Sequence, residues 1–365
     1  MNPKNNANGA LTALTMDRLR SFPMTLRKRL SIVVLGLTAC GIGAAALAQD
    51  SGKPAAEAKP ADAKSAKPAL PAIYDEQADA KAQIAAAVAR AKRENQRVLV
   101  MFGANWCSWC HKLHGLFKSD KEIAHQLSYE YQLVLVDVSG PDGKGFGRNL
   151  DLAKELGADL KKNGIPFLCV LDGNGKPLAA QESGVLEDGD HHSPDKVRDF
   201  LKKFEAEPRA AAKVLEAGLA EAKKTGKPAF VHLSAPWCGW CKRLDALLHG
   251  PELASIFEPA VIDVEIDLDR MPGAKEVQER LRKNAAGGIP WFAFVDGDGK
   301  VLGVSEIDGK NIGFPTEPAE IEHITGLLKA HAKTITPAQL EKVSATLKEA
   351  AAKLEAQRKA ATEKQ

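Results

Sequence analysis

Two Cys-x-x-Cys strings are the parts of this chain best suited to chemistry. Cys107 and Cys110 form the first string, and Cys238 and Cys241 form the second. Each follows a short apolar run and precedes apolar residues at helical spacing, which predicts a pair at a strand-to-helix junction. Free backbone N-H groups at a helix N-terminus favour the thiolate of the first cysteine. Such a pair can attack a substrate disulfide and resolve the mixed disulfide internally, or run the reverse reaction.

Each of the two strings lies in one copy of an internal repeat, so the elements of the repeat must position the cysteines. Trp106 and Trp237 lie 131 residues apart, as do the paired cysteines, whereas Gly-Ile-Pro at 164–166 and 288–290 recurs at an offset of 124. The first unit is therefore seven residues longer between the cysteines and Gly-Ile-Pro. The extra residues are expected in the glycine-rich segment 140–147, because loops absorb insertions best. Each unit has strands and helices in the same alternating order. This order predicts an α/β fold, with a mixed β-sheet flanked by helices in each unit.

The expected elements follow from apolar periodicity and turn residues. Asp-Gly pairs mark the hairpin turns, and a proline suits the first turn of each last helix. In the first unit we expect helices at about 76–95 and 150–161, strands at 98–102, 133–138 and 167–171, and a helix from Pro194. In the second unit we expect helices at about 209–224 and 274–283, strands at 230–233, 261–266 and 291–295, and a helix from Pro318.

The N-terminus has the pattern of an export signal. Three basic residues at 27–29 precede a largely apolar run, which ends in a small-x-small sequence before Gln49. Residues 1–48 are expected to be a signal peptide or, if they are not cleaved, an N-terminal anchor. Leu-Thr-Ala-Cys at 37–40 also resembles a lipoprotein box, in which Cys40 would carry a lipid. The protein is therefore expected in the periplasm or cell envelope, with a membrane tether if the segment is retained.

Composition and charge exclude several classes of protein. With 44% apolar and 27% charged residues, the chain has ample material for buried cores and is not expected to be wholly disordered. The net charge is +3, but residues 1–48 hold six basic residues and one acid, so the remainder carries −2. This balance gives no reason to expect a nucleic-acid partner. Contact with a membrane is expected only through an N-terminal anchor or a lipid on Cys40.

The motifs resemble those of the thioredoxin superfamily. Trp-Cys-Ser-Trp-Cys at 106–110 and Trp-Cys-Gly-Trp-Cys at 237–241, each followed by Gly-Ile-Pro, are similar to its active-site and cis-proline motifs. The resemblance covers roughly 75–206 and 209–331. It implies two tandem thioredoxin-like domains that exchange thiols and disulfides without a metal or an organic cofactor. It also implies that Cys107 and Cys238 attack and that Cys110 and Cys241 resolve.

A substrate-binding surface is expected beside each pair. In this family the backbone before the cis-proline pairs with the bound peptide. The tryptophans near the motifs could add an apolar rim for unfolded peptide. The candidate substrate-binding residues are Trp106, Trp109, Ile165, Pro166, Trp237, Trp240, Ile289 and Pro290.

The sequence departs from the family pattern at the position six residues before each first cysteine. A buried acid stands there in thioredoxins, but this chain has Met101 in one unit and His232 in the other. Met101 cannot move a proton, so the first unit is expected to be slower in its resolving step or to act differently. His232 is a candidate proton acceptor, although a core histidine with a structural role is the commoner case. The dipeptides between the cysteines, Ser-Trp and Gly-Trp, also differ from the common Gly-Pro.

The expected domain plan covers the whole chain. Residues 49–72 read as a flexible Ala/Lys/Pro-rich linker, 73–207 and 208–332 as the two domains, and 333–365 as a helical tail. Thr336 to Gln339 resembles a capping box that opens the tail helix. Its Ala/Lys/Glu-rich composition suggests a solvated helix. Cys169 is expected to be a small buried hydrophobe in a strand.

The expected function is extracytoplasmic thiol-disulfide oxidoreduction. The protein would reduce or isomerise disulfides of client proteins and would need an upstream electron donor. Cys107-x-x-Cys110-His111 also matches the attachment signature of c-type haem. Four thiolates from both pairs could instead share a zinc ion. A fourth reading is a thioredoxin-fold interaction module with static disulfides.

Overall fold

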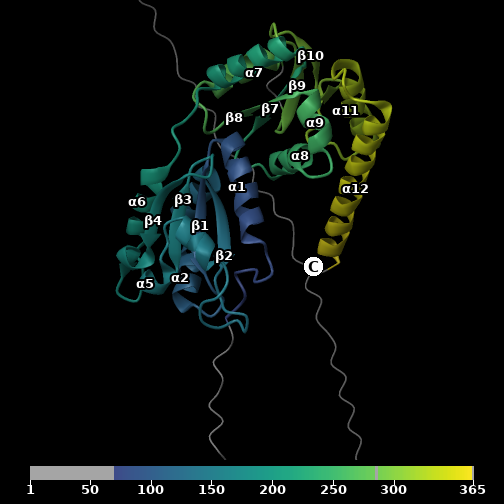
Figure 1. The fold of residues 1–365 in the computed structure, drawn as a ribbon. Coiled ribbons are helices and arrows are strands. Elements are labelled where there is room, and N and C mark those ends of the chain that lie inside the picture. The colour runs from purple at the N-terminus through teal and green to yellow at the C-terminus, as the bar shows by residue number, and fades with distance from the viewer. Residues whose placement is uncertain (1–69, 284–286, 364–365) are drawn as a thin grey trace, which may run out of the picture. The chain divides into compact units, whose positions relative to one another are not determined.

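The structure is a computed structural model that describes residues 70–283 and 287–363. Two sets of elements with a similar order follow each other along these residues, and Figure 1 labels most of them. We call residues 80–204 the first repeat and residues 211–331 the second repeat. The first repeat contains α1 (Ala80–Glu94), β1 (Arg97–Gly103), α2 (Ser108–Ser119), α3 (Lys121–Glu130), β2 (Tyr131–Asp137), α4 (Leu150–Glu155), α5 (Leu160–Asn163), β3 (Phe167–Leu171), β4 (Pro177–Glu182), η1 (Ser183–Leu186), β5 (Glu187–Asp188), β6 (His191–His192) and α6 (Pro194–Phe204).

The second repeat is followed by one long terminal helix. Its elements and that helix are α7 (Ala211–Thr225), β7 (Ala229–Ser234), α8 (Gly239–His249), α9 (Ala254–Ala260), β8 (Ile262–Asp267), α10 (Ala274–Leu281), β9 (Trp291–Val295), β10 (Val301–Val304), β11 (Glu306–Ile307), β12 (Lys310–Asn311), α11 (Pro318–His331) and α12 (Pro337–Thr362).

Each repeat is built on a mixed four-stranded sheet. The strand order is β2-β1-β3-β4 in the first repeat and, reading from the matching edge, β8-β7-β9-β10 in the second. The first two strands of each order are parallel, and the third is antiparallel to its neighbour. The predicted fold class, an α/β fold with mixed sheets flanked by helices, is thereby confirmed.

The central strands are buried on both faces, which explains their continuous apolar sequences. All residues of β3, β7 and β9 are buried. In β1, alternate residues belong to two separate core clusters: Leu99 and Met101 contribute to the cluster that includes both cysteines of the first pair, and Val98 and Val100 to the other. The helix that carries the cysteines therefore packs on one defined face of the sheet.

Short local elements are where the structure departs from the expected pattern. The helices α3 and α9 were not expected, although Asp120 accepts hydrogen bonds from the N-H groups of Glu122 and Ile123 as the N-cap of α3. The helix expected at 150–161 is broken into α4 and α5. Gly157 lies between them with φ of 89°, a conformation that ends a helix and favours glycine.

The expectation of a solvated tail is wrong. The capping box of α12 is confirmed at Thr336 and Gln339. However, Val343 and Leu347 are fully buried in the core cluster of the second repeat, and Leu340 and Leu354 pack against that cluster. Helix α12 thus covers part of this core, and α11 and α12 contact each other.

The predicted N-terminal features lie outside the described residues. These are the signal or anchor at 1–48, Cys40, and most of the linker at 49–72. In the described ranges, no helix combines the length and apolarity needed to cross a membrane.

Candidate active site

Both cysteine pairs lie where the sequence predicts, at the start of a helix that follows a central strand. Cys107 is the N-cap of α2 and Cys238 is the N-cap of α8. In each repeat the N-cap sulfur accepts a hydrogen bond of 3.1 Å from the backbone N-H of the second cysteine. This N-H and the positive end of the helix dipole stabilise negative charge on the first sulfur once the pair is reduced.

Each pair is closed as a disulfide in the structure. Cys107 is bonded to Cys110 and Cys238 to Cys241, with a Cα–Cα distance of 5.3 Å in both. Each repeat therefore holds one self-contained redox pair. Cys169, by contrast, is free and fully buried in β3, and burial raises the pKa of its thiol to about 12. The expectation that Cys169 is a core residue is confirmed.

The Gly-Ile-Pro segments approach the first cysteine of each pair. The peptide bonds Ile165-Pro166 and Ile289-Pro290 are both cis. The Sγ of Cys107 lies 3.6 Å from the carbonyl oxygen of Ile165, and the Sγ of Cys238 lies 3.6 Å from that of Ile289. Two copies with different neighbouring sequences thus place the same backbone carbonyl beside the same sulfur.

Exposed tryptophans flank both pairs. Trp106 is 44% exposed, Trp237 64% and Trp240 38%. Trp240 stacks on Phe314, with ring centroids 6.0 Å apart. Trp109 is partly buried and meets the ring of His192 edge-on. Three of the four candidate rim residues therefore present large apolar surface to solvent next to the disulfides.

His232 lies on β7, the strand that leads to the second pair, but already has a partner. Its Nε2 is 3.0 Å from Oδ1 of Asp263, and Oδ2 of the same carboxylate is 3.2 Å from Nε2 of His249. Burial alone would lower the pKa of His232, but the charge and hydrogen bond of Asp263 raise it to about 9. His232 therefore holds a proton at neutral pH. This state does not suit the proton-acceptor role predicted for it.

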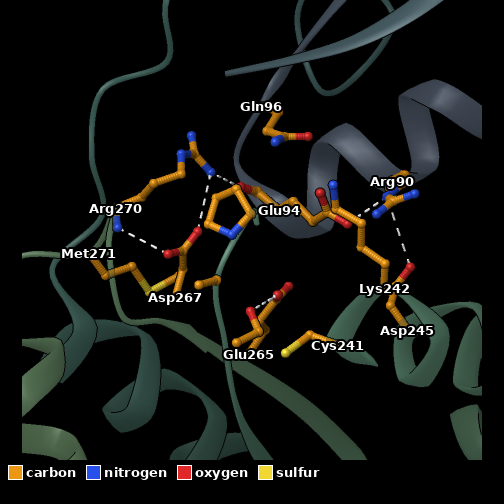
Figure 2. Close-up of a pocket in the computed structure, with 13 residues that line it drawn as sticks. Arg90, Glu94, Gln96, Cys241, Lys242, Asp245, Glu265, Asp267, Arg270 and Met271 are labelled. Atoms are coloured by element: carbon orange, nitrogen blue, oxygen red, sulfur yellow. Dashed lines mark hydrogen bonds and ion pairs between the residues drawn. The ribbon is translucent and has the colours of Figure 1, made fainter. Parts of the chain in front are cut away.

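A carboxyl group that the motifs did not indicate shares a cavity with Cys241. Glu265 on β8, Ser234 and Cys241 line a cavity of about 30 Å³, shown in Figure 2. Ser234 Oγ donates a hydrogen bond to Glu265. Burial raises the pKa of Glu265, while the charge of His232 opposes that rise. A carboxyl with a raised pKa is a suitable proton acceptor for a thiol at neutral pH.

The first repeat has apolar residues at the corresponding positions. His232 pairs with Glu265 across β7 and β8, and in the same register Met101 pairs with Leu135 across β1 and β2. Met101 belongs to the buried apolar cluster around the first pair, and the partly buried Leu135 packs against that cluster. The two sites therefore share their backbone geometry and differ in the ionisable groups behind the resolving cysteine.

Glu265 could have been suspected from the strand pattern. Residues 262–267 alternate apolar and acidic types, which normally means that the acidic face is solvated. Here that face is covered by α8, since Asp263 contacts His249 and Glu265 shares a cavity with Cys241. Packing against residues distant in the sequence distinguishes this arrangement from an ordinary exposed strand face.

The site geometry does not support the hypotheses of a c-type haem at the first pair or of a zinc ion shared by both pairs. The Nε2 of His111, which the haem signature requires, lies 2.8 Å from the backbone oxygen of Asn105. Across the described part of the chain, no group of three or more His, Cys, Asp or Glu side chains is placed to hold a metal ion.

Comparisons with known proteins agree with this geometry. One family model, described as a thioredoxin-like domain, matches residues 84–190, and a second, described as thioredoxin-like, matches residues 210–297. The protein disulfide-isomerase erp38 of Neurospora crassa is 25% identical over 193 residues, which are 51% of this chain and 48% of that protein. The disulfide bond reductase DsbH of Chlamydia pneumoniae is 28% identical over 119 residues, 32% of this chain and 70% of that protein.

The match spans about half the length of erp38 and more than two thirds of DsbH. A solved structure of a disulphide isomerase from Xylella fastidiosa Temecula1 is 32% identical, with a TM-score of 0.32, and covers 37% of this chain and 98% of its own. The two family models lie one on each repeat and together cover more than half of the chain. The chain therefore belongs to the thioredoxin superfamily, as a tandem thioredoxin-like protein whose two Cys pairs are of the thiol-disulfide oxidoreductase kind.

Proposed function

We propose that this protein is an extracytoplasmic enzyme that reduces or isomerises disulfides of client proteins at both Cys pairs. The observation that carries the proposal is the geometry shared by both repeats. An N-cap sulfur lies 3.6 Å from the carbonyl that precedes a cis-proline, beside an exposed tryptophan. This geometry suits an extended client segment, held by backbone hydrogen bonds with its disulfide next to the sulfur.

The reaction starts from the reduced pair. The thiolate of Cys107 or Cys238 attacks one sulfur of the client disulfide, and the other client sulfur leaves with the electron pair and takes a proton from water. The second cysteine, Cys110 or Cys241, then attacks the first and releases the remaining client thiolate. Two electrons pass from the pair to the client. The protein ends in the disulfide form seen in the structure.

In the second repeat we assign the proton acceptor of the resolving step to Glu265. The thiol of Cys241 must lose a proton before it attacks, and the carboxyl shares its cavity. A volume of about 30 Å³ is enough for one water molecule to bridge the two groups. The protonated His232 below them adds a fixed positive charge that stabilises the thiolate.

The cellular location of the protein, the boundaries of its two domains and its redox partners are parts of the same proposal. Export by residues 1–48 would bring the two domains, 73–207 and 208–332, to an oxidising compartment where client disulfides form. There the protein would need a reduced donor to work repeatedly. The names of the relatives, a disulfide-isomerase and a disulfide bond reductase, support this class of client and no particular one.

Insulin reduction by the full chain, with a thiol donor in excess, tests the proposal. We expect turnover by the wild type, a partial loss in Cys238→Ser and in Cys107→Ser, and no turnover above the donor alone in the double variant. The matched control is Cys169→Ser, which alters the buried free cysteine and should leave the rate unchanged. If the double variant keeps the wild-type rate, the pairs are static disulfides and the proposal fails.

A further inference from the structure

Tyr74 lies beside the first Cys pair although it precedes the first repeat. Its segment is held by Asn105, whose Oδ1 accepts hydrogen bonds from the N-H groups of Ile73 and Tyr74 at 2.8 and 2.9 Å. The Nδ2 of Asn105 donates to the carbonyl of Tyr74 at 3.0 Å. Asn105 itself lies two residues before Cys107. The tyrosine is thus fixed to the loop that carries the active-site motif.

The Tyr74 hydroxyl and the resolving sulfur both border Gly103. A Cβ atom added to Gly103 would lie 2.0 Å from the hydroxyl oxygen and 2.8 Å from Sγ of Cys110. Both atoms therefore occupy the space beside Gly103 that a larger residue would fill. This explains the glycine at the end of β1, because any side chain there would displace the tyrosine or the disulfide.

The hydroxyl has no hydrogen-bond partner among the described protein groups. Tyr74 is 3% exposed and its oxygen is buried. The charged group that faces it is Asp137 on β2, whose carboxylate is 3.2 Å from Arg148. Burial, followed by the charge of Asp137, raises the pKa of Tyr74 far above its usual range. The phenol therefore keeps its proton and stays able to donate a hydrogen bond.

We propose that Tyr74 is a catalytic residue of the first pair, which donates a hydrogen bond to the sulfur of Cys110 when the pair is reduced. A sulfur in a disulfide is a poor acceptor, whereas a thiolate accepts strongly, so the unused donor gains its partner on reduction. The second repeat differs at this point. Ser234, at the register position of Gly103, donates its hydroxyl hydrogen bond to Glu265 in the cavity that Cys241 lines.

The step that Tyr74 assists is the closure of the Cys107–Cys110 bond. The thiol of Cys110 loses its proton to solvent water, and the Tyr74 O-H group stabilises the resulting thiolate. The thiolate attacks Cys107, the bond between Cys107 and the client breaks, and the client thiolate leaves with the electron pair and is protonated by water. The phenol proton stays on Tyr74 throughout. This role rests on the proposed exchange at the first pair.

An aromatic disulfide separates this step from the attack that precedes it. In the Cys238→Ser, Cys241→Ser chain, reduced Cys107 attacks 5,5′-dithiobis(2-nitrobenzoate) and releases one coloured thiolate. Cys110 then releases the second. We expect Tyr74→Phe to slow the second release about tenfold near neutral pH and to displace its pH profile upward by about one unit, which matches a hydrogen bond to a charged group. The first release should change less than twofold.

The control is Tyr131→Phe, in the same core cluster. Its hydroxyl donates to the carbonyl of Leu201, away from the cysteines, so both releases should keep their rates. Tyr74→Phe removes an unpartnered hydroxyl, so the oxidised form should unfold at the wild-type temperature or higher. An unchanged second release with an unchanged pH profile overturns the role of Tyr74, as does an equal slowing of both releases. If no second release occurs even with Tyr74 present, the exchange itself is absent and the proposed function of the first pair fails.

Discussion

The ion pair between His232 and Asp263 makes a quantitative prediction for the variant Asp263→Asn. The pKa of His232 rises from 6.5 to about 9 in the folded protein. At 1.36 kcal/mol per pKa unit, this rise corresponds to about 3 kcal/mol of stability. The side chain of Asp263 is 29% exposed, so solvent screens part of the interaction. We therefore expect the substitution to cost about 2 kcal/mol at pH 6.5.

The sign of the pH dependence follows from the direction of the shift. Because the folded pKa of His232 lies above its unfolded value, the pair stabilises the fold fully below pH 6.5. Its contribution is lost as the pH rises through about 9, where the folded histidine gives up its proton. The difference in stability between the wild type and Asp263→Asn should therefore shrink between pH 6.5 and 10.

Urea denaturation of the oxidised proteins at several pH values measures this difference. The control is Asp298→Asn, which removes a carboxylate from an exposed hairpin, where it contacts Lys223 at 2.7 Å. That variant should follow the wild type at every pH, since exposed ion pairs contribute little. If the stability loss in Asp263→Asn is constant from pH 6.5 to 10, His232 is not protonated in the fold and the reasoning is refuted.

Three further predictions concern the second site, the terminal helix and the haem alternative. Glu265→Gln should slow disulfide closure of the second pair by roughly a hundredfold or more at neutral pH, because it removes a proton acceptor. Release of the second thiolate from an aromatic disulfide measures this, and the first pair serves as internal control. Leu347→Ala should destabilise the protein to urea by about 2 to 5 kcal/mol, because it leaves a cavity in a fully buried site. The exposed Lys348→Ala beside it should have no effect, and equal effects of the two would contradict the packing of α12. The purified wild type should show no Soret absorption band, since the first pair closes as a disulfide; such a band would favour the haem reading.

The parts of the site that depend on local structure could be predicted from the sequence. Cys107 and Cys238 are N-caps of helices, and the apolar run before each and the helical spacing after it indicate this position. The hairpin strands β3 and β9 agree with the expected ranges 167–171 and 291–295. In both cases, side-chain periodicity and turn chemistry act over a few residues and can be read directly.

Features that depend on distant contacts were missed. The approach of Tyr74 to Cys110 depends on Asn105, which fixes a segment about thirty residues earlier in the chain. The burial of α12 has a readable trace, since Val343 and Leu347 lie four residues apart on one face. These two apolar residues stand in an Ala/Lys/Glu-rich segment, whose composition favoured the prediction of a solvated helix. A short apolar stripe does not by itself tell which core it will cover.

Trapping of the mixed disulfide tests the central claim most directly. In the full chain, Cys110→Ser and Cys241→Ser remove the resolving cysteines and leave each attacking thiol intact. Incubated in reduced form with a peptide disulfide, these variants should accumulate covalent adducts that mass spectrometry assigns to Cys107 and Cys238. The matching Cys107→Ser and Cys238→Ser variants should accumulate none at the remaining cysteines. Adducts at neither attacking cysteine, or mainly at the resolving ones, would contradict the account.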